Sequence, residues 1–183
     1  RMYEFTGGGV AVLDFDGDGW PDVYLAQGTS WPVDRSDTRH SDRLFRNVGG
    51  GRFEDVTESA GLSETGFGQG VAVGDIDGDG WPDLHVANIG GNRLYLNNGD
   101  GTFRDHTKEL GANSAGWAWS SNFIDLNNDG YEDLVVANGM ITTSNTTDVS
   151  SFAWRRVASQ SPESLEDLGS VFTYRKAWRA LNT

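Results

Sequence analysis

Cysteine is absent from this chain of 183 residues, so neither a disulfide framework nor a thiolate metal site can form. Basic residues are few, with 14 lysines and arginines against 27 acidic residues. The resulting formal charge of −13 makes a nucleic-acid partner unexpected, because phosphate binding needs a basic surface. No run of about 18 apolar residues occurs, so membrane insertion is not expected either. Carboxylates and glycines are the residues that stand out.

The carboxylates gather in three nearly identical segments, DFDGDGWPD at 14–22, DIDGDGWPD at 75–83 and DLNNDGYED at 125–133. Oxygen-bearing side chains at positions 1, 3, 5 and 9 converge only if the backbone coils tightly between them, and the glycine at position 6 permits that turn. Calcium prefers six to eight oxygen ligands. Each segment therefore predicts a calcium-binding loop, and the whole chain is predicted to bind up to three Ca²⁺ ions.

The predicted ligands are four side chains and the position-7 backbone carbonyl of each loop. They are Asp14, Asp16, Asp18, Trp20 and Asp22; Asp75, Asp77, Asp79, Trp81 and Asp83; and Asp125, Asn127, Asp129, Tyr131 and Asp133. A solvated acidic turn is the alternative, but clustered carboxylates repel one another unless a cation offsets them. Zinc is disfavoured because these loops offer only oxygen. The third loop, with asparagine at 127, is predicted to bind most weakly.

The same acidic spacing begins an EF-hand loop, which would place helices on both sides. An EF-hand closes its loop with a bidentate glutamate at position 12. Here position 12 is Leu25, Val86 or Val136, each within an apolar run typical of a strand. The EF-hand is therefore excluded, and the position-9 aspartate is predicted as the last ligand.

An internal repeat organises the chain. The segment RLFRN at 43–47 recurs as RLYLN at 93–97, a shift of 50 residues, and the second and third acidic loops show the same shift. The first two loops are 61 residues apart. The residues beyond the 50-residue repeat are predicted to form a loop insertion within 27–41. Each unit predicts four short antiparallel strands, which is the pattern of one propeller blade.

The predicted fold class is therefore all-β, a partial β-propeller of four-stranded blades with calcium-binding loops. Its units are expected at about 5–61, 62–111 and 112–140, together one repeat region spanning 1–140. A twisted open sheet or a sandwich is the alternative, although repetition with this period is rare in sandwiches. A closed ring needs about four blades, so the chain is expected to be part of a longer one.

Residues 141–183 differ from the repeats. They begin with a loop rich in serine, threonine and asparagine and continue with a predicted short α-helical segment, in which Tyr174, Trp178 and Leu181 share one face. This region is predicted to be an insertion within a blade or a truncated continuation. The helix either packs on its own blades or offers a docking site.

The loops, together with RLYLNNGDGTF at 93–103, resemble the FG-GAP or VCBS-type repeats of integrin α-chain propellers, and most closely the cartilage acidic protein (ASPIC/UnbV) group. The resemblance covers about residues 5–140. It implies a calcium-binding β-propeller, secreted or on the cell surface, used in adhesion or matrix contact. The resemblance places the metal ligands on the same aspartates, with Asn127 as a departure.

Three functions remain open. The favoured one is a non-catalytic, calcium-stabilised propeller for contact with an unidentified protein or glycan ligand. The others are an accessory propeller of a polysaccharide-acting enzyme and a purely structural repeat. An enzyme is not expected, since the three histidines, 40, 85 and 106, are scattered singly and no nucleophile motif is present. Weak calcium loops predict an extracellular, cell-surface or periplasmic location, because cytosolic calcium would not fill them.

Overall fold

The computed structural model describes residues 8–30, 33–113 and 118–138, all of them within one compact unit, Thr6–Gly139. Within these ranges the chain is built of β-strands, and the helical structure is a 3-10 turn at Thr38–His40 in the predicted insertion. The prediction of an all-β repeat region is confirmed. The predicted α-helical segment in 141–183 lies outside the described residues.

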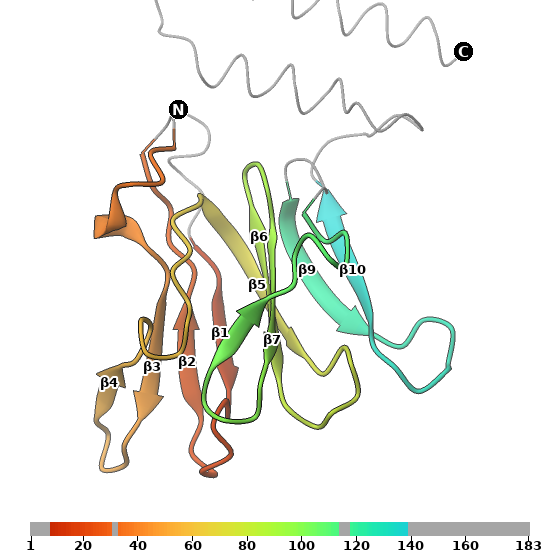
Figure 1. Ribbon diagram of the computed structural model, residues 1–183, viewed down its shortest axis with the longest axis horizontal. Helices are drawn as coiled ribbons and strands as arrows, with labels where there is room; N and C mark the ends of the chain where they lie inside the picture. Colours follow the sequence, from red (N-terminus) through yellow and green to blue (C-terminus); the bar gives the residue numbers. More distant parts are fainter. Residues whose placement is uncertain (1–7, 31–32, 114–117, 139–183) are drawn as a thin grey trace, which may run out of the picture. The chain divides into compact units, whose positions relative to one another are not determined.

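Three antiparallel sheets follow one another along the chain (Figure 1). In the first two sheets the spatial order of the four strands equals their order in sequence, which is the meander of a propeller blade. The third sheet contains two strands among the described residues. The strands are β1 Val10–Leu13, β2 Asp22–Leu25, β3 Arg43–Asn47 and β4 Phe53–Asp55; β5 Gly68–Gly74, β6 Asp83–Asn88, β7 Arg93–Asn97 and β8 Phe103–Asp105; β9 Ala118–Ile124 and β10 Asp133–Asn138.

Each acidic loop joins the first two strands of its sheet. The strand pairs close at Leu13 and Asp22, at Gly74 and Asp83, and at Ile124 and Asp133. Strands thus flank every loop, and the position-12 residues lie within β2, β6 and β10. The exclusion of an EF-hand is confirmed.

The first strands of successive sheets lie side by side, as the innermost strands of propeller blades do. A Cβ atom on Gly9 of the first unit would lie 2.7 Å from the backbone nitrogen of Val71, and one on Gly70 would lie 2.8 Å from the carbonyl oxygen of Trp119. Such contacts are too close for any side chain, which explains the glycines at these positions. The described residues thus form three successive blade-like units and contain no closed ring.

A hydrophobic core fills the space between the first two units. It includes Leu13, Tyr24, Leu84 and Tyr95, and the rings of Phe15 and Phe103 stack with centroids 6.1 Å apart. A smaller cluster around Ala72, Leu94 and Phe123 lies between the second and third units. Because side chains alternate along a strand, β5 contributes to both cores.

The outward faces of the first and third units carry the residue types that are buried between units. Val10 and Val12 are more than 60% exposed, whereas Val71 and Val73, at the equivalent positions of β5, pack against the first core. At the other end Leu126, the equivalent of buried Phe15, is exposed. These two faces therefore have the chemistry of an inter-unit surface.

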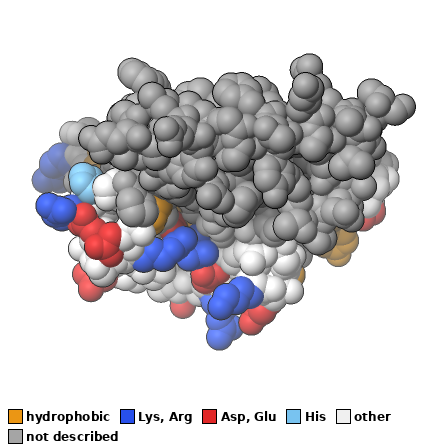
Figure 2. Space-filling view, turned by 90° about the horizontal axis from the view of Figure 1, so that it is seen from above, with side chains coloured by type: hydrophobic (Ala, Val, Ile, Leu, Met, Phe, Trp, Pro, Cys, Tyr) orange, Lys and Arg blue, Asp and Glu red, His pale blue; other side chains and the backbone are white. Residues whose placement is uncertain are grey.

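Elsewhere the described surface is mixed, with exposed Trp20, Phe53 and Leu110 among its polar side chains. Where it is visible in Figure 2, acidic and basic side chains are interspersed rather than separated into patches. No helix among the described residues is long and apolar enough to cross a bilayer.

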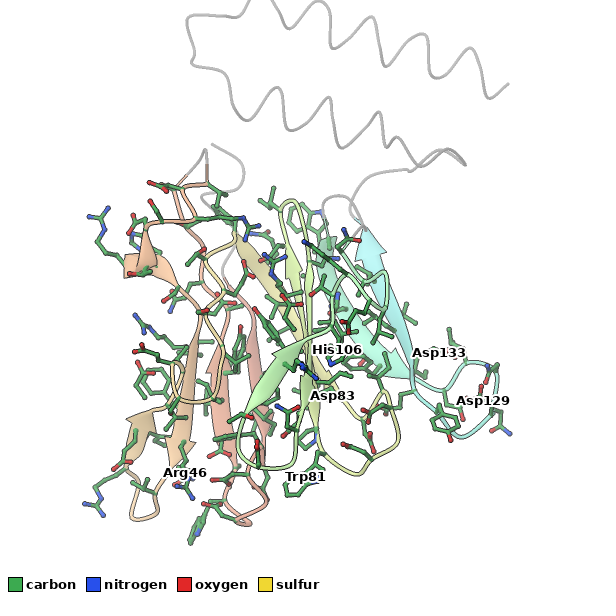
Figure 3. The ribbon with its side chains drawn as sticks, viewed as in Figure 1. Arg46, Trp81, Asp83, His106, Asp129 and Asp133 are labelled. Atoms are coloured by element: carbon green, nitrogen blue, oxygen red, sulfur yellow. The ribbon has the colours of Figure 1, made fainter. Side chains whose placement is uncertain are left out.

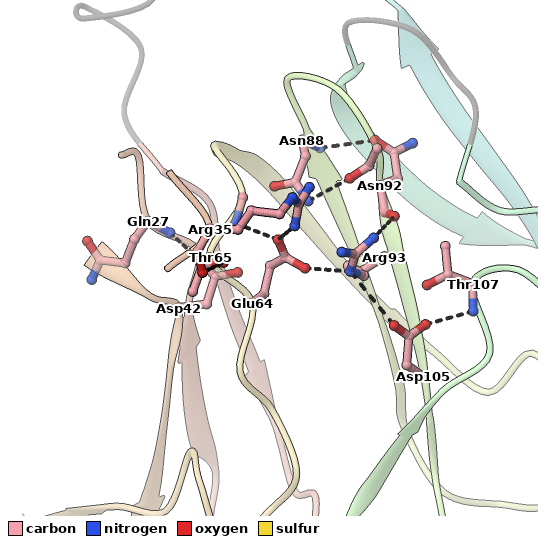
Figure 4. Close-up of polar contacts among 12 residues, drawn as sticks. Gln27, Arg35, Asp42, Glu64, Thr65, Asn88, Asn92, Arg93, Asp105 and Thr107 are labelled. Atoms are coloured by element: carbon pink, nitrogen blue, oxygen red, sulfur yellow. Dashed lines mark hydrogen bonds and ion pairs between the residues drawn. The ribbon is translucent and has the colours of Figure 1, made fainter. Parts of the chain in front are cut away.

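A buried polar network anchors the insertion to the second unit (Figure 4). Its centre is Glu64, whose side chain is only 2% exposed. Glu64 pairs with Arg35 of the insertion at 3.1 Å and with Arg93 of β7 at 2.6 Å. Because a buried carboxylate is tolerated only when it is paired, these two arginines account for its position.

Asp42 and Asn92 occupy equivalent positions before the third strand of their units. Asp42 accepts the backbone N–H of Gln27 at 2.7 Å, and Asn92 accepts that of Asn88 at 3.0 Å. Asp42 also accepts a hydrogen bond from the Tyr24 hydroxyl at 2.7 Å. Burial raises the pKa of Asp42 to about 7, and the nearby Glu64 carboxylate adds to the rise.

The Asp42→Asn variant, which copies Asn92, should abolish a pH dependence of stability. The folded-state pKa of Asp42 lies above its unfolded value. Its contribution to the free energy of unfolding is therefore fully present below about pH 4 and is lost as pH rises through about 7. Between about pH 5 and pH 8 the variant should therefore gain on the order of 2 kcal/mol in free energy of unfolding relative to wild type. Denaturant titrations in EDTA measure this, with Glu58→Gln as the control; parallel curves for wild type and Asp42→Asn would contradict it.

Candidate metal centre

The three acidic loops share one backbone conformation. In each, the position-1 aspartate accepts a hydrogen bond from the backbone N–H of the position-6 glycine, at 3.0, 2.9 and 2.9 Å in chain order. That glycine has φ of +85°, +91° and +91° in the three loops, a region that favours residues without a Cβ atom. The predicted need for glycine at position 6 is confirmed.

The side chains at positions 3 and 5 of each loop use one oxygen to hold the turn. In the second loop, Asp77 Oδ1 accepts the N–H of Asp79 at 3.2 Å, and Asp79 Oδ1 accepts the N–H of Trp81 at 2.8 Å. The first and third loops repeat these contacts. In the first two loops, the second oxygen of each of these carboxylates therefore accepts no backbone hydrogen bond from the described residues.

The position-9 aspartate has a structural role that the sequence did not reveal. Asp83 is fully buried and accepts two backbone N–H groups, from Ile76 in the loop and from Asn97 on β7, both at 2.9 Å. Asp22 does the same with Phe15 at 3.2 Å and Asn47 at 2.7 Å. This residue thus joins the loop to the third strand, and the asparagine that ends each RLxxN segment is the signal that accompanies it.

Burial raises the pKa values of these carboxyl groups. Burial raises the pKa of Asp83 to about 6; the two backbone hydrogen bonds oppose this rise, and the charges of Asp77 and Asp79 add to it. The pKa values of Asp22 and Asp77 are also raised, in both cases chiefly by burial and further by neighbouring aspartates. A bound cation would relieve this repulsion.

Two loops bring three carboxylates together. Asp14, Asp16 and Asp18 each offer an oxygen within 4.8 Å of the others, and so do Asp75, Asp77 and Asp83. Two predicted ligands, Asp22 and Asp79, lie outside these groups. The backbone carbonyls of Trp20, Trp81 and Tyr131 remain predicted ligands.

In the third loop, no such group of three acids forms among the described residues. Asn127 replaces an acid there, and its Nδ2 donates to Asp129 Oδ2 at 2.9 Å. Leu126 donates its N–H to Asp133 at 3.1 Å, so the position-9 contact with the loop is retained. With Asp129 and Asp133, Asp125 is one of the three acids among the predicted ligands of this loop. Figure 3 shows Asp129 and Asp133 on this loop.

The residues of the first two loops fit a hard divalent cation. Asp14 Oδ1 is buried and has no hydrogen-bond partner, so it lacks the positive partner that a buried carboxylate oxygen requires. The donors are all oxygens at a spacing suited to Ca²⁺. Asp14, Asp16 and Asp18 would hold one ion and Asp75, Asp77 and Asp83 another.

An arginine outside the loops contacts the first acidic loop. Arg46 on β3 places its Nε 2.6 Å from Asp16 Oδ2 and its Nη2 3.1 Å from Asp18 Oδ2. It lies at the loop end of its strand (Figure 3). Nothing in the sequence marked Arg46 as part of the site, because its contacts bridge 28 residues of chain.

The aromatic residue at position 7 packs against the preceding unit. Ring atoms of Trp81 lie 2.9 Å from where a Cβ on Gly17 would be, and Tyr131 stands in the same relation to Gly78 at 2.8 Å. Position 4 of the first and second loops is thus in contact with the aromatic ring of the next loop. For Trp81 and Tyr131 this is packing between neighbouring units.

Two of the three histidines, His85 and His106, contact polar side chains, and His40 is exposed. His85 is fully buried, its Nδ1 lies 2.8 Å from the Ser121 hydroxyl on β9, and burial lowers its pKa to about 4. His106 pairs with Glu109 at 2.5 Å and lines a cavity of about 560 Å³ whose other lining residues are mostly apolar. This cavity reaches Asp77 of the second loop.

Repeated four-stranded meanders with acidic loops between their first two strands define a tandem-repeat protein of the propeller-blade class. The chain belongs to the FG-GAP-like repeat family, whose sequence pattern matches residues 14–86 and again 75–136. Both matches begin at an acidic loop. A search of curated proteins found no match.

The Gly17→Ala variant should be more destabilised than Gly49→Ala. Both glycines have positive φ, +70° and +76°, so alanine costs about 1–2 kcal/mol of backbone strain at either position. A Cβ on Gly49 meets nothing within 4 Å, whereas one on Gly17 meets Trp81. Overpacking should add about 1–3 kcal/mol at Gly17, measurable by chemical denaturation. Equal losses in free energy of unfolding would show that the packing of Trp81 does not require glycine at position 17.

Proposed function

We propose that this chain is a calcium-binding propeller module that contacts an extracellular protein or glycan and performs no chemistry itself. The observation that carries the proposal is the convergence of three carboxylates in each of two loops, with Asp14 Oδ1 buried and without a partner. Membership of the FG-GAP-like repeat family supports it, and the relationship would be closest to the cartilage acidic protein (ASPIC/UnbV) group.

Calcium would stabilise the fold of each unit. Each loop connects the first two strands of its unit, and its position-9 aspartate is bonded to the third strand, so a cation in the loop would stabilise the whole blade. At a dissociation constant of about 10⁻⁴ M and free calcium of about 1–2 mM, mass action contributes about 1.5 kcal/mol per site. The third loop, with fewer charges, would bind most weakly.

The proposed location is extracellular, on the cell surface or periplasmic. Sites of this affinity fill only where calcium is near millimolar, which excludes the resting cytosol. The proposed partner is a protein or glycan that contacts the blades.

Calcium should raise the melting temperature, and Asp77→Asn should remove part of that response. A stabilisation of about 1.5 kcal/mol per filled site corresponds to a shift of about 3–5 °C for a chain of this size. Differential scanning calorimetry with calcium and with EDTA measures it. Glu58→Gln, which changes an exposed carboxyl outside the loops, is the control and should respond like wild type. Identical melting curves with calcium and EDTA would overturn the calcium proposal.

The loops should fill in an order that follows their carboxylate content. Asp125→Asn should remove only the weakest binding step, because the third loop already has asparagine at 127. Asp75→Asn should remove a tighter step, because that loop gathers three carboxylates. Calorimetric titration of calcium into each variant distinguishes the steps. Loss of the tightest step in Asp125→Asn would show that charge count does not set the order.

A further inference from the structure

The first and second acidic loops differ in one neighbouring side chain. Arg46 on β3 occupies the position that Leu96 occupies on β7, as the strand registers show: Arg46 pairs with Glu54 and Leu96 with Arg104. Arg46 contacts Asp16 and Asp18, and Leu96 lines a cavity together with Asp77, the second-loop equivalent of Asp16. A guanidinium thus borders the first loop where an alkyl group borders the second.

The arginine takes the oxygens that the backbone leaves free. Asp16 Oδ1 and Asp18 Oδ1 accept backbone N–H groups. Arg46 Nη2 donates a hydrogen bond to Asp18 Oδ2, and the guanidinium forms an ion pair with Asp16 Oδ2. In the second loop, Asp77 and Asp79 also use Oδ1 for the backbone. Among the described residues, however, no lysine or arginine pairs with their Oδ2 atoms.

These free oxygens are the ones a cation needs. A divalent ion in the first loop would compete with the guanidinium for the Oδ2 lone pairs and would be repelled by its charge if it stayed. Arg46 has room to leave, since its side chain is 41% exposed. In the second loop a cation would meet neither obstacle.

We propose that Arg46 is a built-in competitor for the cation at the first loop, neutralising the empty loop and leaving when the ion binds. This rests on the proposed calcium function and adds that the two three-carboxylate loops are unequal. The second loop fills first, and the first loop stays ordered without metal because it carries its own positive charge. An ion pair as exposed as this one has modest strength, so the expected effect on affinity is about fivefold.

The test isolates the first site and then removes the arginine. In a background carrying Asp77→Asn and Asp129→Asn, calcium affinity of the first loop is measured by isothermal titration calorimetry with and without Arg46→Leu. The variant, which copies Leu96, should bind about fivefold more tightly. Arg43→Leu is the matched control: it removes the same charge from the same strand, but Arg43 pairs with Asp55 and not with the loop. Its affinity should stay close to that of the background.

The reciprocal exchange places an arginine beside the second loop. In a background carrying Asp16→Asn and Asp129→Asn, Leu96→Arg should weaken the second site about fivefold. In EDTA, Arg46→Leu should also melt at a lower temperature than Arg43→Leu, because it leaves the empty first loop without a counter-charge. Far-ultraviolet circular dichroism checks that each variant is folded.

The outcomes separate this inference from the calcium proposal. If every folded variant, wild type included, fails to bind calcium, both are overturned. If wild type binds but Arg46→Leu binds equally or more weakly than its background, Arg46 is not a competitor and the calcium proposal stands. A gain in affinity shared by Arg43→Leu would assign the effect to net charge and would likewise overturn the role of Arg46.

Discussion

The aspartate at position 9 of each loop, buried in the first two units, is the constraint on which the rest of the unit depends. In the first two units its carboxylate accepts one N–H from the loop before it and one from the third strand of the sheet. These bonds fix the loop, the second strand and the third strand together. The cost is a carboxylate removed from water, which the raised pKa values of Asp22 and Asp83 express. Placing several more carboxylates in the same loop compounds that cost.

The three loops meet this electrostatic cost in different ways. The first has a guanidinium at its free oxygens, the second has acids without a basic partner among the described residues, and the third exchanges one acid for Asn127. Loops that look alike in sequence therefore present different electrostatic environments to a cation. In a repeat protein each unit contacts only its neighbours, so such differences can arise one unit at a time.

Much of the fold follows from patterns that repeat along the chain. The strands leading into and out of each loop, the hairpins and the glycine at position 6 all lie where the sequence indicates, because short apolar runs and glycine-rich turns are local signals. The contacts of Arg46 and the seating of Trp81 on Gly17 were not predictable in this way. Both join segments distant in sequence, and neither residue type by itself indicates a partner. Asp42 is a similar case, since only burial beside Glu64 distinguishes it from an ordinary aspartate.

Spacing alone determined that this chain is a repeat of four-stranded units with oxygen-rich loops, since each carboxylate in a loop is placed by the few residues of backbone between it and the next. Tertiary structure decided which carboxylates come together, which accept hydrogen bonds from backbone N–H groups and which pair with a guanidinium. The physical reason is that a free oxygen is defined by everything within hydrogen-bonding distance, and in these loops much of that comes from the third strand and from the neighbouring unit.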